Sequence, residues 1–357
     1  AIKEICDCVI DAKIHKKSKK ELLQNLKTIR GIYVPSFYNV SYSENHQIKG
    51  TFPKYEDLPN KILSRIIPEL KNKYYPEKPI VPLIEVTHDR LAIEVMRGCT
   101  EGCRFCNAGM IYRPIRERSE IDIVDYSLTA IANSGYEELS LLSLSISDYS
   151  KLSTLLGLQS QALNGKHVNV SFPSMRLDSF NEEIAEFAKQ VRKSGFTFAP
   201  EAGSQRLRKV INKNITEEDL LKAVKIALEN GWKLLKFYFM IGLPTETKED
   251  IISIGKLIEQ VVQLSKKYGR VKFKVSISPF SPKSHTPFQW EKQDTKEEFL
   301  KKIDILKKML YRFKHVSLDW RDPAVSEIEC VLGRGNRQIA QVIYRAWKAG
   351  AKFDGWS

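Results

Sequence analysis

The chain has 357 residues, of which 42% are hydrophobic and 28% are charged, so it can bury a sizeable core and wholesale disorder is excluded. The longest apolar stretch, around Leu234 to Leu243, is interrupted by Lys236 and has the length of a strand, which excludes a membrane-spanning helix there. The net charge of +14 is spread along the chain and permits an anionic partner such as RNA, although a lysine-rich solvated surface explains it equally well.

The first 84 residues show helical and hairpin patterns. Apolar residues recur at helical spacing over residues 1–30, with a break before Ser18, a candidate N-cap. Residues 32–52 alternate between apolar and polar, which predicts a hairpin, and Pro82–Val86 is typical of a short strand. The chain begins with alanine and shows no leader. We therefore expect a piece of a longer protein, with residues 1–84 as the tail and linker of a preceding domain.

From residue 91 the sequence alternates between strand-like and helix-like segments. Six segments have the length and composition of strands: Leu91–Met96, Leu139–Leu144, Val168–Phe172, Phe196–Ala199, Leu234–Met240 and Lys272–Ile277. Amphipathic helical stretches lie between them, among them Ile121–Asn133, Glu182–Lys193, Glu217–Asn230 and Lys248–Lys267. This alternation predicts an α/β fold, a partial (βα)6 barrel of the TIM type over residues 85–290, with its chemistry in the loops after the strands.

After residue 290 the alternation stops. The pattern predicts helices at Lys296–Phe313, Ser326–Val331 and Arg337–Ala349 and a strand at His315–Trp320. Residues 291–357 are therefore interpreted as a C-terminal α/β extension packed on the barrel. Cys330 lies in an apolar helical segment, where a buried structural thiol is expected.

Three of the six cysteines form a motif directly after the first predicted barrel strand. Cys99, Cys103 and Cys106 have C-x3-C-x2-C spacing. Thiolates on one short loop can bind three irons of a [4Fe–4S] cluster and leave the fourth iron open. This clustering indicates a metal and a reducing compartment, the cytoplasm. The alternatives are a structural zinc site, for which no fourth ligand lies nearby, and disulfides or unrelated core thiols.

This motif resembles the signature of the radical S-adenosylmethionine (SAM) superfamily, C-x3-C-x-aromatic-C, with Phe105 at the aromatic position. The resemblance implies that the three cysteines hold a [4Fe–4S] cluster and that the amino and carboxylate groups of SAM bind the open iron. It also implies that one electron cleaves SAM to methionine and a deoxyadenosyl radical, which abstracts hydrogen from a substrate. An electron donor such as flavodoxin or ferredoxin is then a partner.

The same resemblance suggests SAM contacts at the ends of the second and third strands. The candidates for the SAM amino group are Ser145, Ser147 and Asp148, although the family's Gly-Gly-Glu stretch is absent here. Asp148 alternatively caps the following helix. The third strand ends with Ser171, followed by Ser174 and Arg176. These residues either face SAM or, for Arg176, pair with a carboxylate such as Asp178.

Further candidates follow the fourth and fifth strands. Glu201 resembles the family carboxylate that contacts the ribose hydroxyls, because a carboxylate can accept two hydrogen bonds from a diol. Its alternative role is capping of the next helix. Arg206 and Arg208 either pair with the SAM carboxylate or are surface helix residues. The turn that begins at Gly242 resembles a family turn whose glycine allows close approach of the backbone to adenine; the alternative is a turn followed by a capping box.

Residues 278–290, 334–337 and 353–356 extend the resemblance to a bacterial subgroup in which a cobalamin-binding-like domain precedes the barrel. Cobalamin is thus implied through a domain upstream of residue 1. Residues 283–290 also resemble the end of methylthiotransferase barrels, which act on tRNA.

Four arginines near the predicted cysteine loop suit an anionic substrate, RNA or a phosphorylated metabolite, unless they pair with neighbouring acidic residues. They are Arg104, Arg113, Arg116 and Arg118. The sequence therefore supports a radical SAM enzyme that modifies RNA or protein, with methyl or methylthio transfer as the reaction. Two other hypotheses are an iron–sulfur module that does not cleave SAM and a zinc-stabilised RNA-binding protein.

Overall fold

The computed structural model describes residues 1–71, 75–171 and 195–351, and it divides the chain into two compact units, residues 1–68 and 69–357. The first unit contains helices α1 (Ile2–Ile14) and α2 (Lys19–Leu26) and a hairpin of β1 (Tyr38–Tyr42) and β2 (Ile48–Pro53). Ser18 caps α2 in a capping box with Glu21. The predicted helix pair, N-cap and hairpin are all confirmed.

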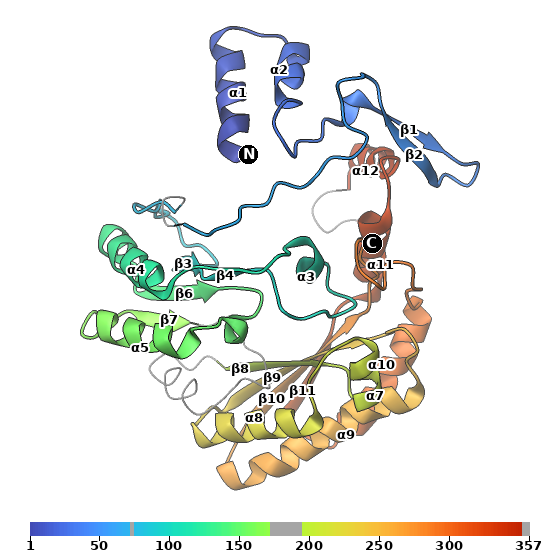
Figure 1. Ribbon diagram of the computed structural model, residues 1–357. Coiled ribbons are helices and arrows are strands. Elements are labelled where there is room, and N and C mark those ends of the chain that lie inside the picture. The colour runs from blue at the N-terminus through green and yellow to red at the C-terminus, as the bar shows by residue number, and fades with distance from the viewer. Residues whose placement is uncertain (72–74, 172–194, 352–357) are drawn as a thin grey trace. The chain divides into compact units, whose positions relative to one another are not determined.

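The second unit is built on parallel strands. One sheet has the order β3-β6-β7 and a second has the order β11-β10-β9-β8, with every pairing in both sheets parallel (Figure 1). The strands are β3 (Leu91–Glu94), β6 (Glu138–Leu142), β7 (Asn169–Ser171), β8 (Phe196–Glu201), β9 (Leu234–Ile241), β10 (Lys272–Pro279) and β11 (Val316–Trp320). All six predicted strands are present, and the partial (βα)6 barrel fold is confirmed.

Helices follow most of the strands. They are α3 (Asn107–Ile111), α4 (Glu120–Ser134), α5 (Leu152–Leu163), α7 (Gln205–Val210), α8 (Glu217–Glu229), α9 (Lys248–Ser265), α10 (Lys296–Leu310), α11 (Pro323–Arg334) and α12 (Ile339–Lys348). The predicted helix Glu182–Lys193 lies outside the described residues. Within the described ranges, none of the helices has both the length and the apolar character that crossing a bilayer requires.

The larger core lies between the sheet β8–β11 and helices α8, α9 and α10, which cover one of its faces (Figure 1). Alternation along each strand decides which side chains enter this core. On β9, Leu235, Phe237 and Phe239 are fully buried, whereas Lys236 and Tyr238 lie on the other face and remain accessible. The sheet is thus apolar toward the helices and polar on the side opposite them.

Two segments differ from the sequence-based expectation. The predicted strand Pro82–Val86 is wrong: no strand forms there, and Leu83 and Ile84 are exposed. Prolines at positions 79 and 82 remove backbone donors that strand pairing would need. The segment β11, assigned from sequence to the C-terminal extension packed on the barrel, pairs in register with β10. The parallel sheet therefore continues beyond residue 290.

Helix α9 packs closely against the turn that follows β8. A Cβ atom at Gly203 would lie 2.3 Å from the Ile254 backbone nitrogen, which is fixed in the middle of the helix. At Gly157 in α5, by contrast, a Cβ atom would have no neighbour within 4 Å. A substitution at Gly203 therefore tests how closely α9 packs against this turn. A substitution at Gly157 tests only the conformational entropy of the helix backbone.

We expect Gly203→Ala to destabilise the protein by about 1–3 kcal/mol or more, because α9 must move to admit the methyl group. Gly157→Ala should instead stabilise it by about 0.5–1 kcal/mol, since alanine is the better helix former. Denaturant unfolding of both variants checks this. An unchanged midpoint for Gly203→Ala would contradict the packing described here.

Candidate functional site

The three motif cysteines lie on a loop that begins after β4 (Met96–Arg97) and ends at α3, where Cys106 is the N-cap residue. The base of the loop is closed by antiparallel pairing of β4 with β5 (Arg116–Glu117). Gly98 has φ +96°, and a Cβ there would lie 3.0 Å from the Tyr112 carbonyl oxygen. Glycine is therefore required for the chain to enter the loop.

Hydrogen bonds fasten this loop to the segment after α7. The Arg104 amide donates to the Ile211 carbonyl over 3.0 Å, and Asn212 Nδ2 donates to the Gly102 carbonyl over 3.0 Å. The Phe288 amide, which follows β10, donates to the Arg104 carbonyl over 3.3 Å. The cysteine loop is consequently held beside segments that follow β8 and β10.

Phe105 packs with an apolar group at the same end of the sheet, which we call the Phe105 cluster. Its buried members come from the segments that follow β8, β9 and β10: Ala202, Leu207, Ile211, Leu243, Phe280 and Phe288. Phe105 thus adds an apolar contact to the hydrogen bonds of the loop. Phe105, the aromatic residue of the motif, therefore helps to hold the cysteine loop against the end of the sheet.

The three thiols influence one another electrostatically. Burial raises the pKa of Cys103 to about 11, which Lys213 opposes, while Cys106 and the carboxylates of Glu101 and Glu201 add to the rise. Burial also raises the pKa of Cys99, with Asp148, Glu101 and Cys106 contributing. Because Cys99 and Cys103 are protonated on their own, a bound cation would displace their protons.

In the part of the chain that the structure describes, no three His, Cys, Asp or Glu side chains are grouped as ligands of a single metal ion. Thiolates of an iron–sulfur cluster each bind a separate iron. The donor set, three thiols on one fastened loop, fits such a cluster.

The segment after β6 brings Asp148, one of the three predicted amino-group ligands, to the cysteine loop. Asp148 Oδ2 accepts a hydrogen bond from the Thr100 hydroxyl. Ser145 is buried, and its hydroxyl has no hydrogen-bond partner among the described residues. Asp148 does not cap α5, whose N-cap is Lys151, so that alternative is wrong. Ser147 is half-buried in the same segment.

The segment after β7 is only partly described. The Ser171 hydroxyl donates to Glu138 Oε1 over 3.0 Å, and Arg90 pairs with the same oxygen at 3.2 Å. Ser171 is therefore engaged with the start of β6. Ser174 and Arg176, and residues 353–356 at the end of the chain, lie outside the described residues.

Glu201 ends β8 in a strained conformation, with φ +66° after a register shift in the pairing with β9. Burial raises its pKa to about 7, although Lys213 Nζ, 3.9 Å from Oε1, opposes the rise. The cap of α7 is Ser204, whose hydroxyl accepts from the Leu207 amide. The capping alternative for Glu201 is therefore wrong, and its carboxylate lies near the Cys103 thiol.

The two arginines of α7 have other partners. Arg206 pairs with Asp250 and donates to the Thr245 carbonyl over 2.8 Å, so it ties α7 to the turn after β9. Arg208 is fully buried and donates to the Ala202 carbonyl over 2.9 Å. Arg208 is thus neither a surface residue nor accessible to a ligand carboxylate.

The turn after β9 holds a buried charge cluster that the sequence analysis missed. Gly242 has φ +83°, and its amide donates to Glu246 Oε1 over 2.8 Å. Lys302 of α10 lies 2.7 Å from Glu246 Oε1 and 2.5 Å from Asp294 Oδ2. Burial raises the pKa of Glu246, and Lys302 opposes the rise.

The same turn leads into α9. Asp250 accepts a hydrogen bond from the Thr247 amide over 2.8 Å, which confirms the predicted capping interaction.

The four arginines of the cysteine loop and its continuation donate mainly to backbone carbonyls. Arg104 donates to Val210, Arg113 to Gly109, Arg116 to Tyr112 and Arg118 to Glu94. The acidic side chains that were expected to pair with them have other contacts: Glu117 accepts from Ser150, and Glu120 pairs with Lys151. Arg118 is buried, whereas Arg104 and Arg113 are exposed.

Comparison with known proteins agrees with this geometry. Residues 93–258 match the model of the Radical SAM superfamily. The chain therefore contains a domain of that superfamily, whose members use a [4Fe–4S] cluster and SAM, as the cysteine motif predicts.

Among curated relatives, an uncharacterized protein of Methanocaldococcus jannaschii is 31% identical over 282 residues, covering 76% of this chain and 60% of its own length. A tRNA-2-methylthio-N(6)-dimethylallyladenosine synthase of Desulforamulus reducens is 26% identical, covering 52% of this chain and 43% of its own. The chain thus spans about half the length of the curated relatives it matches.

Among solved structures, the radical SAM methyltransferase TsrM of Kitasatospora setae, with cobalamin and a [4Fe–4S] cluster bound, has a TM-score of 0.46 at 16% identity. It covers 57% of this chain and 39% of its own.

We expect Lys302→Met to destabilise the protein by about 3 kcal/mol at neutral pH, because it leaves the buried Glu246 carboxylate without its cation. The pKa of Glu246 in the folded variant then rises further above the ordinary value of 4.5, so the loss grows as pH rises above that value and nearly vanishes below it.

Denaturant unfolding between acidic and neutral pH measures this dependence, with Lys301→Met, an exposed lysine of the same helix, as control. Equal losses in the two variants at every pH would refute the assignment.

Proposed function

We propose that the protein is a radical SAM enzyme that cleaves SAM reductively at a [4Fe–4S] cluster. The observation that carries the proposal is the single cysteine loop, fastened by its own backbone to the segments that follow β8 and β10. When bound, the cluster supplies one electron that splits SAM into methionine and a deoxyadenosyl radical. Cys99, Cys103 and Cys106 are the proposed ligands.

The residues around the loop suit the polar groups of SAM. We propose that Ser145 and Asp148, with Ser147 beside them, receive the amino group, because the Ser145 hydroxyl is buried without a partner and would gain one. Glu201 is proposed for the ribose hydroxyls, since it lies close to Cys103 and is partly shielded from water. The backbone at Gly242 is proposed to lie close to the adenine of SAM. Arg206 and Ser171 are proposed to support neighbouring turns, in view of their contacts with Asp250 and Glu138.

Exclusion of water is the second task of this end of the sheet. A carbon radical reacts with whatever lies nearest, so the site must hold the substrate close and keep other groups away. The Phe105 cluster supplies apolar surface directly behind the cysteine loop.

We assign the barrel to residues 85–290, preceded by a linker and followed by an extension that adds β11 to the sheet.

We propose RNA as the substrate and methyl or methylthio transfer as the reaction. Support comes from the relatives, which include tRNA methylthiolating enzymes, and from the net charge of +14. Cobalamin, proposed through a further domain, would serve methyl transfer. Flavodoxin or ferredoxin is the proposed electron donor. The cytoplasm is the proposed location, because reduced thiols are required and all six cysteines are free.

The first test is SAM cleavage itself. Anaerobically reconstituted and reduced protein should release deoxyadenosine from SAM, as measured by chromatography of the quenched mixture. An intact cluster that yields no product would favour an iron–sulfur module without SAM cleavage. Zinc without iron in anaerobically purified protein would favour the zinc-stabilised alternative.

Changing any one of Cys99, Cys103 or Cys106 to Ala should abolish the cluster, because no other thiol of the described residues lies on the loop. Wild-type protein should bind about four irons per chain, as a cubane cluster contains. Iron analysis and visible absorbance give the measurement. Cys330→Ala is the matched control, and an equal loss of iron there would show that the ligands are assigned wrongly.

For Glu201→Gln we expect the KM for SAM to rise about tenfold, the loss of one hydrogen bond to a charged acceptor. Iron content should not change, since the cysteine loop is untouched. Deoxyadenosine release at varied SAM concentration gives KM. Glu249→Gln, an exposed carboxylate in the first turn of α9, is the control, and indistinguishable KM values would remove Glu201 from the SAM site.

A further inference from the structure

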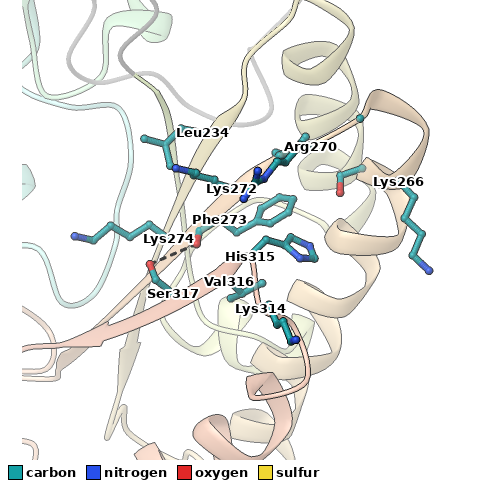
Figure 2. A pocket seen from close by; sticks show the side chains of 13 residues that line it. Leu234, Lys266, Arg270, Lys272, Phe273, Lys274, Lys314, His315, Val316 and Ser317 are labelled. Carbon is teal, nitrogen blue, oxygen red and sulfur yellow. Dashed lines mark hydrogen bonds between the residues drawn. The ribbon is translucent and has the colours of Figure 1, made fainter.

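A cavity lies at the opposite end of the sheet from the cysteine loop. It has a volume of about 690 Å³ and opens at the amino ends of β9, β10 and β11 (Figure 2). Lys272 begins β10 and Pro279 ends it, so the cavity and the strand ends near the cysteine loop are separated by roughly 23 Å at about 3.3 Å per residue. Chemistry in this fold takes place at the carboxyl ends of the strands, and the cavity is therefore outside the site described above.

Positive side chains from two segments, residues 266–272 and the turn before β11, surround the cavity (Figure 2). Lys266 and Arg270 come from the end of α9 and the loop before β10, Lys272 from β10 itself, and Lys314 from the turn before β11. All four are exposed. Within the described ranges no carboxylate lies within ion-pair distance of any of them, whereas Lys274, at the cavity edge, pairs with Asp319 at 2.8 Å.

Four cations around one cavity repel each other unless an anion joins them. Three of the four come from residues 266–272, and folding brings Lys314 of the turn before β11 beside them. Because lysine presents a mobile point charge, it suits the successive phosphates of a chain better than one small ligand with fixed geometry.

An aromatic surface lies beside the cations. The exposed His315 ring stands 5.6 Å from the ring of Phe273, which is buried beneath it. Histidine is among the side chains on which unpaired RNA bases stack. The cavity therefore offers contacts for both the phosphates and a base of a single strand.

We propose that this cavity is an RNA-binding site, in which Lys266, Arg270, Lys272 and Lys314 hold backbone phosphates and His315 stacks on a base. The inference rests on the proposed function, since it assigns to RNA a second contact area on the same domain. An RNA that occupies it while reaching the cysteine loop must span the length of the sheet. The cavity would thus add affinity and orientation without taking part in the chemistry.

The test measures binding of a fluorescently labelled oligouridylate to the full chain by anisotropy, at several salt concentrations. The test variant carries Arg270→Gln, Lys272→Gln and Lys314→Gln. Binding should weaken, and the slope of log K against log salt should become shallower by about 2, because each lost contact with a single strand removes about 0.7. The control carries Lys256→Gln, Lys301→Gln and Lys308→Gln on exposed helix positions and should keep the wild-type slope.

A second variant, with Lys272→Arg and Lys314→Arg, should restore binding, which separates loss of charge from loss of folding. The proposal is overturned if the test variant and the control bind alike, or if inorganic phosphate displaces the RNA at matched ionic strength, since the cavity would then take a small anion. SAM cleavage without RNA, measured in parallel, reports on the proposed function alone, so failure of one does not imply failure of the other.

Discussion

The fastening of the cysteine loop is the constraint on which the site depends. Gly98 turns the chain where a side chain would collide with the Tyr112 carbonyl, and the Arg104 amide then reaches the Ile211 carbonyl. Phe105 completes the attachment through the Phe105 cluster. A ligand loop this short could otherwise adopt many conformations, so these contacts remove the entropy that cluster binding would have to overcome.

Charge is distributed unequally over the two ends of the sheet. At the end with the cysteines, two cations of the turns are paired with carboxylates: Arg206 with Asp250, and Lys302 with Glu246 and Asp294. These pairs fix the turns after β8 and β9. At the other end, the four cavity cations lack such partners among the described residues. Paired charges at one end thus position the residues of the proposed chemistry, while the remaining cations stay available to an external anion.

Much of the fold could be predicted because the barrel signals are local. Alternation of apolar residues on β9 and β10, and a polar N-cap such as Ser18, each act within a few residues of the chain. The wrong prediction of a strand at Pro82–Val86 shows the limit of this reasoning. A segment of residues that favour strands forms one only where a neighbouring strand can pair with it. The same limit explains β11, whose place beside β10 depends on a pairing between distant segments.

For the site, the sequence by itself determined the proposed ligand set, because three thiols and an aromatic residue at fixed spacing define the family signature. Only the tertiary structure decided which polar residues approach it. Folding brings Asp148 to Thr100 and Glu201 to the vicinity of Cys103. Arg206, in contrast, forms an ion pair with Asp250. Lys302 and the cavity went unnoticed in the sequence for the same reason: only the folded sheet brings Lys302 to Glu246 and Lys314 to residues 266–272.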